Sequence, residues 1–185
     1  DSFPKGVINF IYGDGAETSG TLMASGKIDC LAFIGTSRVA NILKKQHPNP
    51  NRLRGALGLE AKNPAIILAD AELDMTVSEV ITGSLSFNGQ RCTALKIIFV
   101  HESISKKFLD RFCSKIAQLK AGMPWEENVM LTPLTEKGKT EYLKELIDDA
   151  LAKGAKVANE NGGTVLESFM FPAVLTGVNS EMRIY

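Results

Sequence analysis

The chain lacks the features that would place it in a membrane or on a nucleic acid. No apolar stretch among its 185 residues approaches the roughly 20 needed to span a bilayer. Its 21 Lys and Arg balance its 21 Asp and Glu, and no arginine-rich run or basic stripe appears. Nucleic-acid-binding proteins concentrate positive charge in such stripes. We therefore expect neither a membrane nor a nucleic acid as a partner.

Cysteine and histidine are also scarce, with three cysteines and two histidines. Cys30, Cys92 and Cys113 follow no metal-binding spacing, and an odd number cannot pair into a complete disulfide set. The N-terminus lacks the charged-then-apolar layout of an export signal. Free thiols suit a reducing compartment, so we expect a cytoplasmic protein without a metal site.

What the chain does contain is an alternation of strand-like and helix-like segments. In the first third Gly35 closes a β-rich run, and Thr36 follows where a helix N-cap is expected. This succession indicates the second half of a doubly wound α/β domain. The expected order is strand, helix, strand and helix, over residues 7–11, 18–24, 30–34 and 39–45.

The alternation continues to the C-terminus, with a crossing to a second domain near residue 58. Strands are expected at 54–60, 65–68 and 95–100, and helices at 73–87, 103–120 and 135–153. In the middle helix a row at i, i+4 spacing predicts core rather than a binding stripe: Ile104, Phe108, Phe112 and Ile116. Met75 and Tyr142 are expected to face inward from the other two helices.

One short segment, residues 87–94 (FNGQRCTA), carries reactive chemistry. Cys92 follows a Gly-Gln turn and lies beside Arg91, whose positive charge favours the nucleophilic thiolate. Small residues leave room for a carbonyl, and the backbone N–H of Cys92 or Thr93 would stabilise an oxyanion. A lone cysteine after a loop is also compatible with a buried structural thiol, so the residues alone leave both interpretations open.

Residues 89–94 (GQRCTA) resemble the active-site cysteine segment of the aldehyde dehydrogenase superfamily. Residues 90–94 and 131–134 (LTPL) look most like its non-phosphorylating, NADP-dependent glyceraldehyde-3-phosphate dehydrogenase branch. The resemblance spans essentially the whole chain, because further segments match in the same order: 3–9 (FPKGVIN), 33–37 (FIGTS), 61–64 (AKNP), 70–74 (DAELD), 172–174 (PAV) and 181–183 (EMR).

The resemblance implies an aldehyde dehydrogenase-like α/β fold. Residues 1–58 would be the distal part of a Rossmann-like NAD(P)-binding domain, and 59–185 most of the catalytic domain that carries the cysteine. The chain looks like an internal fragment of such an enzyme, C-terminally incomplete, and we expect it to be inactive alone. Family members are commonly dimers or tetramers, so a homo-oligomer is expected for the full-length protein.

The resemblance also implies the chemistry. Cys92 would attack a small aldehyde to form a thiohemiacetal, pass hydride to NADP or NAD, and leave a thioester for hydrolysis. Gly35 and Thr36 match the family's pyrophosphate contact at a helix N-terminus. Val39 would face the adenine, although a plain core position suits it equally.

The two residues that flank Cys92, Arg91 and Thr93, are candidate substrate-binding residues. Arg91 would hold a substrate phosphate through paired N–H donors. Semialdehyde branches carry the same Gln-Arg-Cys, so Arg91 could instead tune only the loop and the thiolate. Thr93 is a further candidate for substrate contact.

The main departure from the family lies before the cysteine. The family usually has Glu-Leu-Gly-Gly-Lys, and its glutamate activates the deacylating water. Aligning Lys62 with the family's lysine puts Gly58 at the glutamate position. Glu60 lies two residues further on, and residues i and i+2 of an extended segment face the same side about 6–7 Å apart. Glu60 is therefore a candidate catalytic base, with a pKa raised by burial. The alternative is a structural carboxylate paired with Lys62.

This gap keeps two other functions open. Enzymes of the superfamily that transfer the acyl group to coenzyme A lack the glutamate, and residues 61–63 resemble their semialdehyde members. A non-catalytic homologue or fragment is the third interpretation, although an intact Gln-Arg-Cys-Thr argues against a degenerate site.

Overall fold

A computed structural model of the chain describes residues 3–185, which divide by their internal contacts into two compact units. The first unit is Asp1–Ala61 and the second is Lys62–Tyr185. The boundary expected at residue 58 lies just before this division. The roles assigned to the two parts, cofactor domain and catalytic domain, remain predictions.

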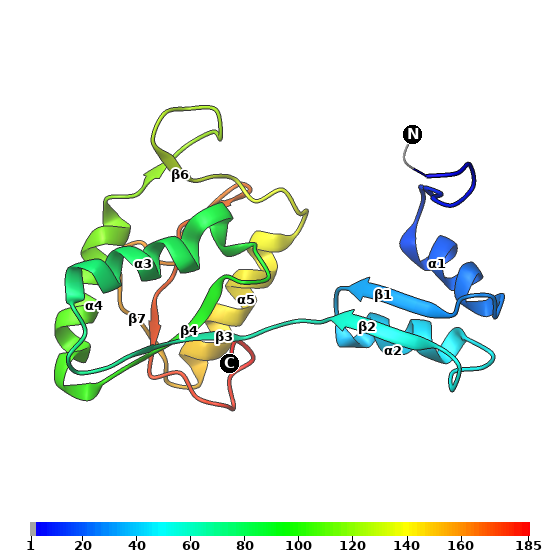
Figure 1. Cartoon of the computed structure of the whole chain (residues 1–185). Helices are drawn as coiled ribbons and strands as arrows, with labels where there is room; N and C mark the ends of the chain where they lie inside the picture. Colours follow the sequence, from blue (N-terminus) through cyan, green and yellow to red (C-terminus); the bar gives the residue numbers. More distant parts are fainter. Residues whose placement is uncertain (1–2) are drawn as a thin grey trace. The chain divides into compact units, whose positions relative to one another are not determined.

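The first unit contains a pair of parallel strands and two helices (Figure 1). Strands β1 (Cys30–Ile34) and β2 (Arg54–Gly58) pair in register from Cys30 opposite Arg54 to Ile34 opposite Gly58. Helix α1 (Gly15–Ala24) contacts α2 (Ser37–Gln46). The α/β alternation predicted for residues 18–45 is therefore confirmed.

The strand expected at residues 7–11 is wrong. This segment has no strand assignment, and its apolar side chains are exposed, with Phe10 at 79% and Ile11 at 61%. A β-rich run forms a strand only when a neighbouring strand satisfies its backbone N–H and C=O groups. Among residues 3–185, no strand pairs with this segment.

The second unit repeats the parallel strand pair with β3 (Asn63–Ile67) and β4 (Leu95–Val100). Between them run α3 (Leu73–Leu85) and the 3₁₀ turn η1 (Ser86–Gly89), and after them α4 (Glu102–Ala117). The remaining elements are β5 (Lys120–Ala121), β6 (Val129–Leu131), α5 (Lys139–Ala152), β7 (Lys156–Val157), β8 (Val165–Leu166), β9 (Phe169–Met170) and β10 (Leu175–Thr176). β5 and β6 are parallel, whereas β7–β10 and β8–β9 are antiparallel pairs.

The main core lies where α3 and α4 pack on one face of the β3–β4 pair. Phe108 and Phe112 stack with their ring centres 5.4 Å apart, and burial of each such side chain contributes roughly 1.5–3 kcal/mol. The inward row predicted for α4 is confirmed. The buried members of this core are Ile67, Val77, Val80, Ile81, Phe108, Phe112 and Ile116.

Two predicted inward residues point to solvent instead. Met75 is 64% exposed because Val77, Val80 and Ile81 define the buried stripe of α3, and a residue two positions before Val77 lies on another face. Tyr142 is 48% exposed, and the Lys139 ammonium lies 5.5 Å from its ring centre. None of the helices within residues 3–185 is long and apolar enough to cross a bilayer.

Candidate active site

The loop that carries Cys92 begins with a tight left-handed turn at the end of α3. Phe87, Asn88 and Gly89 have φ values of 54°, 54° and 69°, and the Gln90 N–H donates to the Phe87 carbonyl at 3.0 Å. Positive φ at the two central residues is typical of a type I′ turn, for which Asn-Gly is a favoured pair. Gly89 is required here because a Cβ would lie 2.8 Å from the Ser84 carbonyl oxygen.

A side-chain bracket holds this turn in place. Asn88 Nδ2 donates to the backbone oxygen and to Oγ1 of Thr132, both at 2.8 Å, and the Thr132 N–H donates back to Asn88 Oδ1 at 3.0 Å. Thr132 directly follows β6, so the bracket ties the loop to the end of that strand. These three bonds offset the roughly 1–2 kcal/mol that a left-handed non-glycine residue costs.

Cys92 lies in a second turn, which immediately precedes β4. The Ala94 N–H donates to the Arg91 carbonyl at 3.0 Å, and neither Cys92 nor Thr93 has a positive φ, as in a type I turn. Cys92 and Thr93 are exposed, whereas Ala94 is buried. The exposure of Cys92 contradicts the buried structural alternative. A structural role suits Cys113 better, because this residue is half-buried on α4 and its thiol pKa is raised by burial and by Asp110.

Arg91 is held on the same loop. Its Nη2 donates to Ser86 Oγ at 2.8 Å, and the guanidinium carbon lies 5.3 Å from the ring centre of Phe87. These contacts tie the guanidinium to the start of the loop, at Ser86 and Phe87, which suits the loop-tuning interpretation. Within residues 3–185 the Arg91 guanidinium donates one hydrogen bond, to Ser86. Its other N–H groups are therefore available to an anionic group of a substrate.

Glu60 is bound to the N-terminus of α2. Its Oε2 accepts the Ser37 N–H at 2.7 Å, and its Oε1 accepts the Ser37 hydroxyl. The carboxylate is exposed, and the Ser37 hydroxyl, followed by backbone N–H groups, holds the pKa of Glu60 below its ordinary value. The expectation of a pKa raised by burial is therefore wrong. Glu60 pairs with Ser37 rather than with Lys62, whose Nζ donates to the Ile184 carbonyl.

The same helix start suits the anionic part of a dinucleotide. Thr36 caps α2 by accepting the Val39 N–H at 3.3 Å, and the Ser37 donors already hold an oxyanion, the Glu60 carboxylate. At Gly35 an added Cβ would lie 2.5 Å from the tip of the Phe33 ring, so a larger residue would have to displace that side chain. Val39 is half-buried on the helix. The donors fit a pyrophosphate that takes the place of the carboxylate.

Comparison with known proteins decides the family. A model of the aldehyde dehydrogenase family matches residues 2–185, essentially the whole chain. The chain belongs to the aldehyde dehydrogenase family. The predicted family and the aldehyde dehydrogenase-like α/β fold are thus both confirmed.

Individual members of the aldehyde dehydrogenase family show the same likeness. An NADP-dependent glyceraldehyde-3-phosphate dehydrogenase of Apium graveolens is 34% identical over 98% of this chain and 35% of its own length. The structure of succinate-semialdehyde dehydrogenase from Burkholderia pseudomallei matches 99% of this chain and 38% of its own, with a TM-score of 0.89 and 31% identity. That of an NADP-dependent glyceraldehyde-3-phosphate dehydrogenase from Bacillus halodurans C-125, complexed with NADP, matches 94% and 35% with a TM-score of 0.82 and 30% identity. The chain spans about a third of the length of these relatives.

The candidate residues of this aldehyde dehydrogenase family chain form two groups. Arg91, Cys92 and Thr93 share one loop of the second unit, whereas the first unit holds Gly35, Thr36, Val39 and Glu60 at the start of α2. No cluster of three or more metal-ligating side chains occurs within residues 3–185.

Sequence reasoning missed the residues that shape the loop. Asn63 Nδ2 donates to the Cys92 carbonyl at 2.6 Å and to the Ala94 carbonyl at 3.1 Å. The sequence indicates Asn88 only as a loop residue, and its partner Thr132 only as part of the LTPL segment. Asn63 lies inside segment 61–64, which resembles the family, and Asn88 directly precedes segment 89–94; that was the available signal. Their partners, 29 and 44 positions away, become visible only in the fold.

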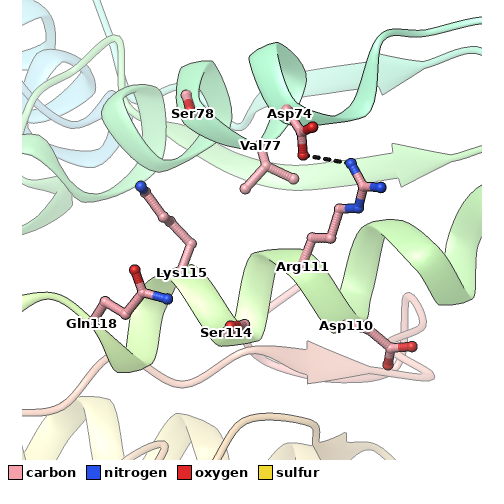
Figure 2. Close-up of a pocket in the computed structure, with 8 residues that line it drawn as sticks. All are labelled: Asp74, Val77, Ser78, Asp110, Arg111, Ser114, Lys115 and Gln118. Carbon is pink, nitrogen blue, oxygen red and sulfur yellow. Dashed lines mark hydrogen bonds and ion pairs between the residues drawn. The ribbon is translucent and has the colours of Figure 1, made fainter.

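A charged groove lies between α3 and α4, and none of these residues lines it. Figure 2 shows Asp74 of α3 paired with Arg111 of α4 across it. The groove is lined by Asp74, Val77, Ser78, Asp110, Arg111, Ser114, Lys115 and Gln118. It holds no cysteine or histidine, and we assign no part of the reaction to it.

Proposed function

We propose that this chain is the nucleophile-bearing part of an NAD(P)-dependent enzyme that oxidises a small phosphorylated aldehyde, of the glyceraldehyde 3-phosphate type, to its acid. The observation that carries the proposal is that Cys92 is exposed in a turn and directly follows Arg91, whose guanidinium is held by contacts within the same loop. Relatives that are NADP-dependent glyceraldehyde-3-phosphate dehydrogenases support the choice of substrate.

The loop accounts for the first chemical step. The Cys92 thiolate attacks the aldehyde carbon, a C–S bond forms, and the carbonyl π electrons move onto oxygen. The backbone N–H groups of Cys92 and Thr93 donate to no protein atom within residues 3–185, so they are available to this oxyanion. Arg91 binds the phosphate at the other end of the substrate through its unused N–H donors.

Bound NADP or NAD supplies the hydride acceptor. Loss of hydride from the thiohemiacetal carbon restores the C=O bond and leaves a thioester on Cys92. Water then adds to the thioester carbon, the C–S bond breaks, and the acid and the thiolate separate. Thr36 and Ser37 would hold the cofactor's pyrophosphate at the start of α2, with Gly35 giving close backbone approach and Val39 facing the adenine.

Glu60 remains the proposed base that activates water for hydrolysis of the thioester. Two of its properties make it a poor base. A carboxylate with a lowered pKa is a weaker base, and Ser37 must release Glu60 before it can act elsewhere. Gly58 stands where the family usually has its glutamate. These observations favour a second candidate function, transfer of the acyl group to coenzyme A.

Rapid mixing of the intact protein with NADP and glyceraldehyde 3-phosphate, with and without coenzyme A, tests both functions. Steady NADPH formation without coenzyme A supports the hydrolytic enzyme. A burst of one equivalent per Cys92 that resumes only with coenzyme A supports the acyltransferring one. Absence of NADPH formation with any small aldehyde contradicts both, as does an unchanged rate in Cys92→Ala.

We also propose a cytoplasmic location and a homo-oligomeric state for the intact protein. The free thiols of Cys30, Cys92 and Cys113 support a reducing compartment. The oligomer rests on the family resemblance alone, and light scattering of the intact protein would test it.

A further inference from the structure

The two peptide groups on either side of Cys92 are both tied by their carbonyl oxygens. The Arg91 carbonyl accepts the Ala94 N–H at 3.0 Å, and the Cys92 carbonyl accepts Asn63 Nδ2 at 2.6 Å. No peptide bond in residues 3–185 is cis. In a trans peptide the N–H points opposite to the C=O. The Cys92 N–H therefore points away from Ala94, and the Thr93 N–H points away from Asn63.

Asn63 is built for this contact. A primary amide nitrogen carries two hydrogens, and the chain offers it two carbonyls, those of Cys92 and Ala94. Asn63 is the first residue of β3 and lies opposite Leu95, the first residue of β4, with a register irregularity directly after it. Its side chain thus reaches the turn at the point where that turn enters the sheet.

Without Asn63, the peptide group between Cys92 and Thr93 would be free to rotate within the turn. In a type I turn the only internal bond joins the first and fourth residues, so the peptide between the two central residues has no partner of its own. That peptide is Cys92–Thr93 in this chain. On the exposed side Lys96 Nζ lies 3.4 Å from the Arg91 oxygen, and it makes no bond to the Cys92 oxygen.

We propose that Asn63 is a positioning residue for catalysis: by holding the Cys92 carbonyl, it aims the Thr93 N–H, beside the Cys92 N–H, at the oxygen of the bound aldehyde. The inference rests on the proposed function, because it needs Cys92 as the nucleophile. The charge that develops on oxygen when the C–S bond forms then meets two oriented donors. Asn63 itself contacts neither the substrate nor the thiol.

The test compares Asn63→Leu, which removes the amide at similar volume, with Asn63→Ser, which keeps one donor. Removal of one oxyanion donor typically slows the chemical step about 10²–10³-fold, and misorientation of a donor that is still present should cost about 10–100-fold. We expect Asn63→Leu to slow the NADPH burst by about 10–100-fold and to leave KM within about threefold. Asn63→Ser should recover part of the rate.

A second readout separates positioning from loosening of the loop. Iodoacetamide alkylates the thiolate of Cys92 by displacement at carbon, with no carbonyl oxyanion to stabilise. We expect alkylation of Cys92 in both variants to stay within about twofold of the parent protein. The matched control is Asn159→Leu, because Asn159 also bridges backbone groups, the Pro172 carbonyl and the Val174 N–H, but contacts no residue of the loop.

Three results would overturn the inference: an unchanged burst in Asn63→Leu, parallel losses of burst and alkylation, or an equal loss of burst in Asn159→Leu. If Asn63→Leu does not fold, Asn63→Ser carries the test, with an expected burst about 3–10-fold slower at unchanged alkylation. If the parent protein itself shows no burst, the proposed function has failed instead.

Discussion

Arg91 has two roles open to it, because its contacts with Ser86 and Phe87 leave donors unused. If it binds the substrate phosphate, Arg91→Ala should raise KM for glyceraldehyde 3-phosphate about 10–100-fold, the value of a lost hydrogen bond to a charged group. KM for propanal should change little. Ser86→Ala is the control, since it frees the guanidinium without removing its charge. Equal effects of Arg91→Ala on both aldehydes would leave Arg91 with only a role in the loop.

Glu60 makes a pH-dependent contribution to the stability of the fold, and the sign of this contribution follows from its lowered pKa. Ser37 binds the ionised carboxylate, so the stabilisation is complete above the ordinary glutamate pKa of 4.5 and is lost as pH falls through the lower folded-state value. Other carboxylates have lowered pKa values too, namely Glu72, Glu141 and Asp149. The contribution of Glu60 is therefore measured as the difference in stability between the parent protein and a Glu60 variant.

We therefore expect the melting temperature of the parent protein to exceed that of Glu60→Gln above about pH 5 and to converge towards it in acid. Thermal unfolding followed by circular dichroism at several pH values measures this difference. A gap that is independent of pH would show that the bond to Ser37 does not depend on charge.

At the scale of elements, the turn between α3 and β4 depends on backbone conformation as well as on side chains. Gly89→Ala should destabilise the protein by about 1–2 kcal/mol for the left-handed conformation, with a further loss from the Cβ contact with the Ser84 oxygen. Gly138→Ala is a matched control, because Gly138 has a φ of 76° and an added Cβ there would meet no atom within 4 Å. Urea unfolding of both variants checks the difference, and equal losses would show that the Ser84 contact relaxes without cost.

Elements were predictable where a local pattern decides them. The i, i+4 row of Phe108, Phe112 and Ile116 fixes the buried face of α4 without knowledge of any other segment. The helix expected from residue 135 begins instead at Lys139, because Gly138 adopts a left-handed conformation at its N-cap. The absence of a strand at residues 7–11 was not predictable, because a strand requires a pairing partner and β propensity alone does not reveal whether one is present.

The site shows the same division between local and non-local information. Cys92 and Arg91 were predictable because the reactive residue types stand side by side in the sequence. The contacts of Asn63 with Cys92, and of Asn88 with Thr132, join distant segments, so no local pattern indicates them. The pKa expected for Glu60 was wrong for a related reason, since its partner Ser37 lies 23 positions earlier.

For the whole molecule, the strand pairs leave large apolar surfaces uncovered. One face of the β3–β4 pair packs on α3 and α4, while on the other Ile66 is 71% exposed, Leu68 61% and Phe99 49%. Ile66 lies directly opposite Phe99 in the register, so their side chains adjoin. Parallel sheets in proteins are almost always covered on both faces, and exposed apolar patches promote association.

We expect the 185-residue chain in isolation to bind the dye ANS and to self-associate, as measured by fluorescence and light scattering. The double variant Ile66→Lys, Phe99→Lys should weaken both signals, because it places two charges on the uncovered face without touching the α3–α4 core. Met75→Lys is the matched control: Met75 is as exposed as these residues, at 64%, but lies on α3 away from that face. A chain that stays monomeric and ANS-negative, or a control that acts as strongly as the double variant, would show that association does not depend on this face.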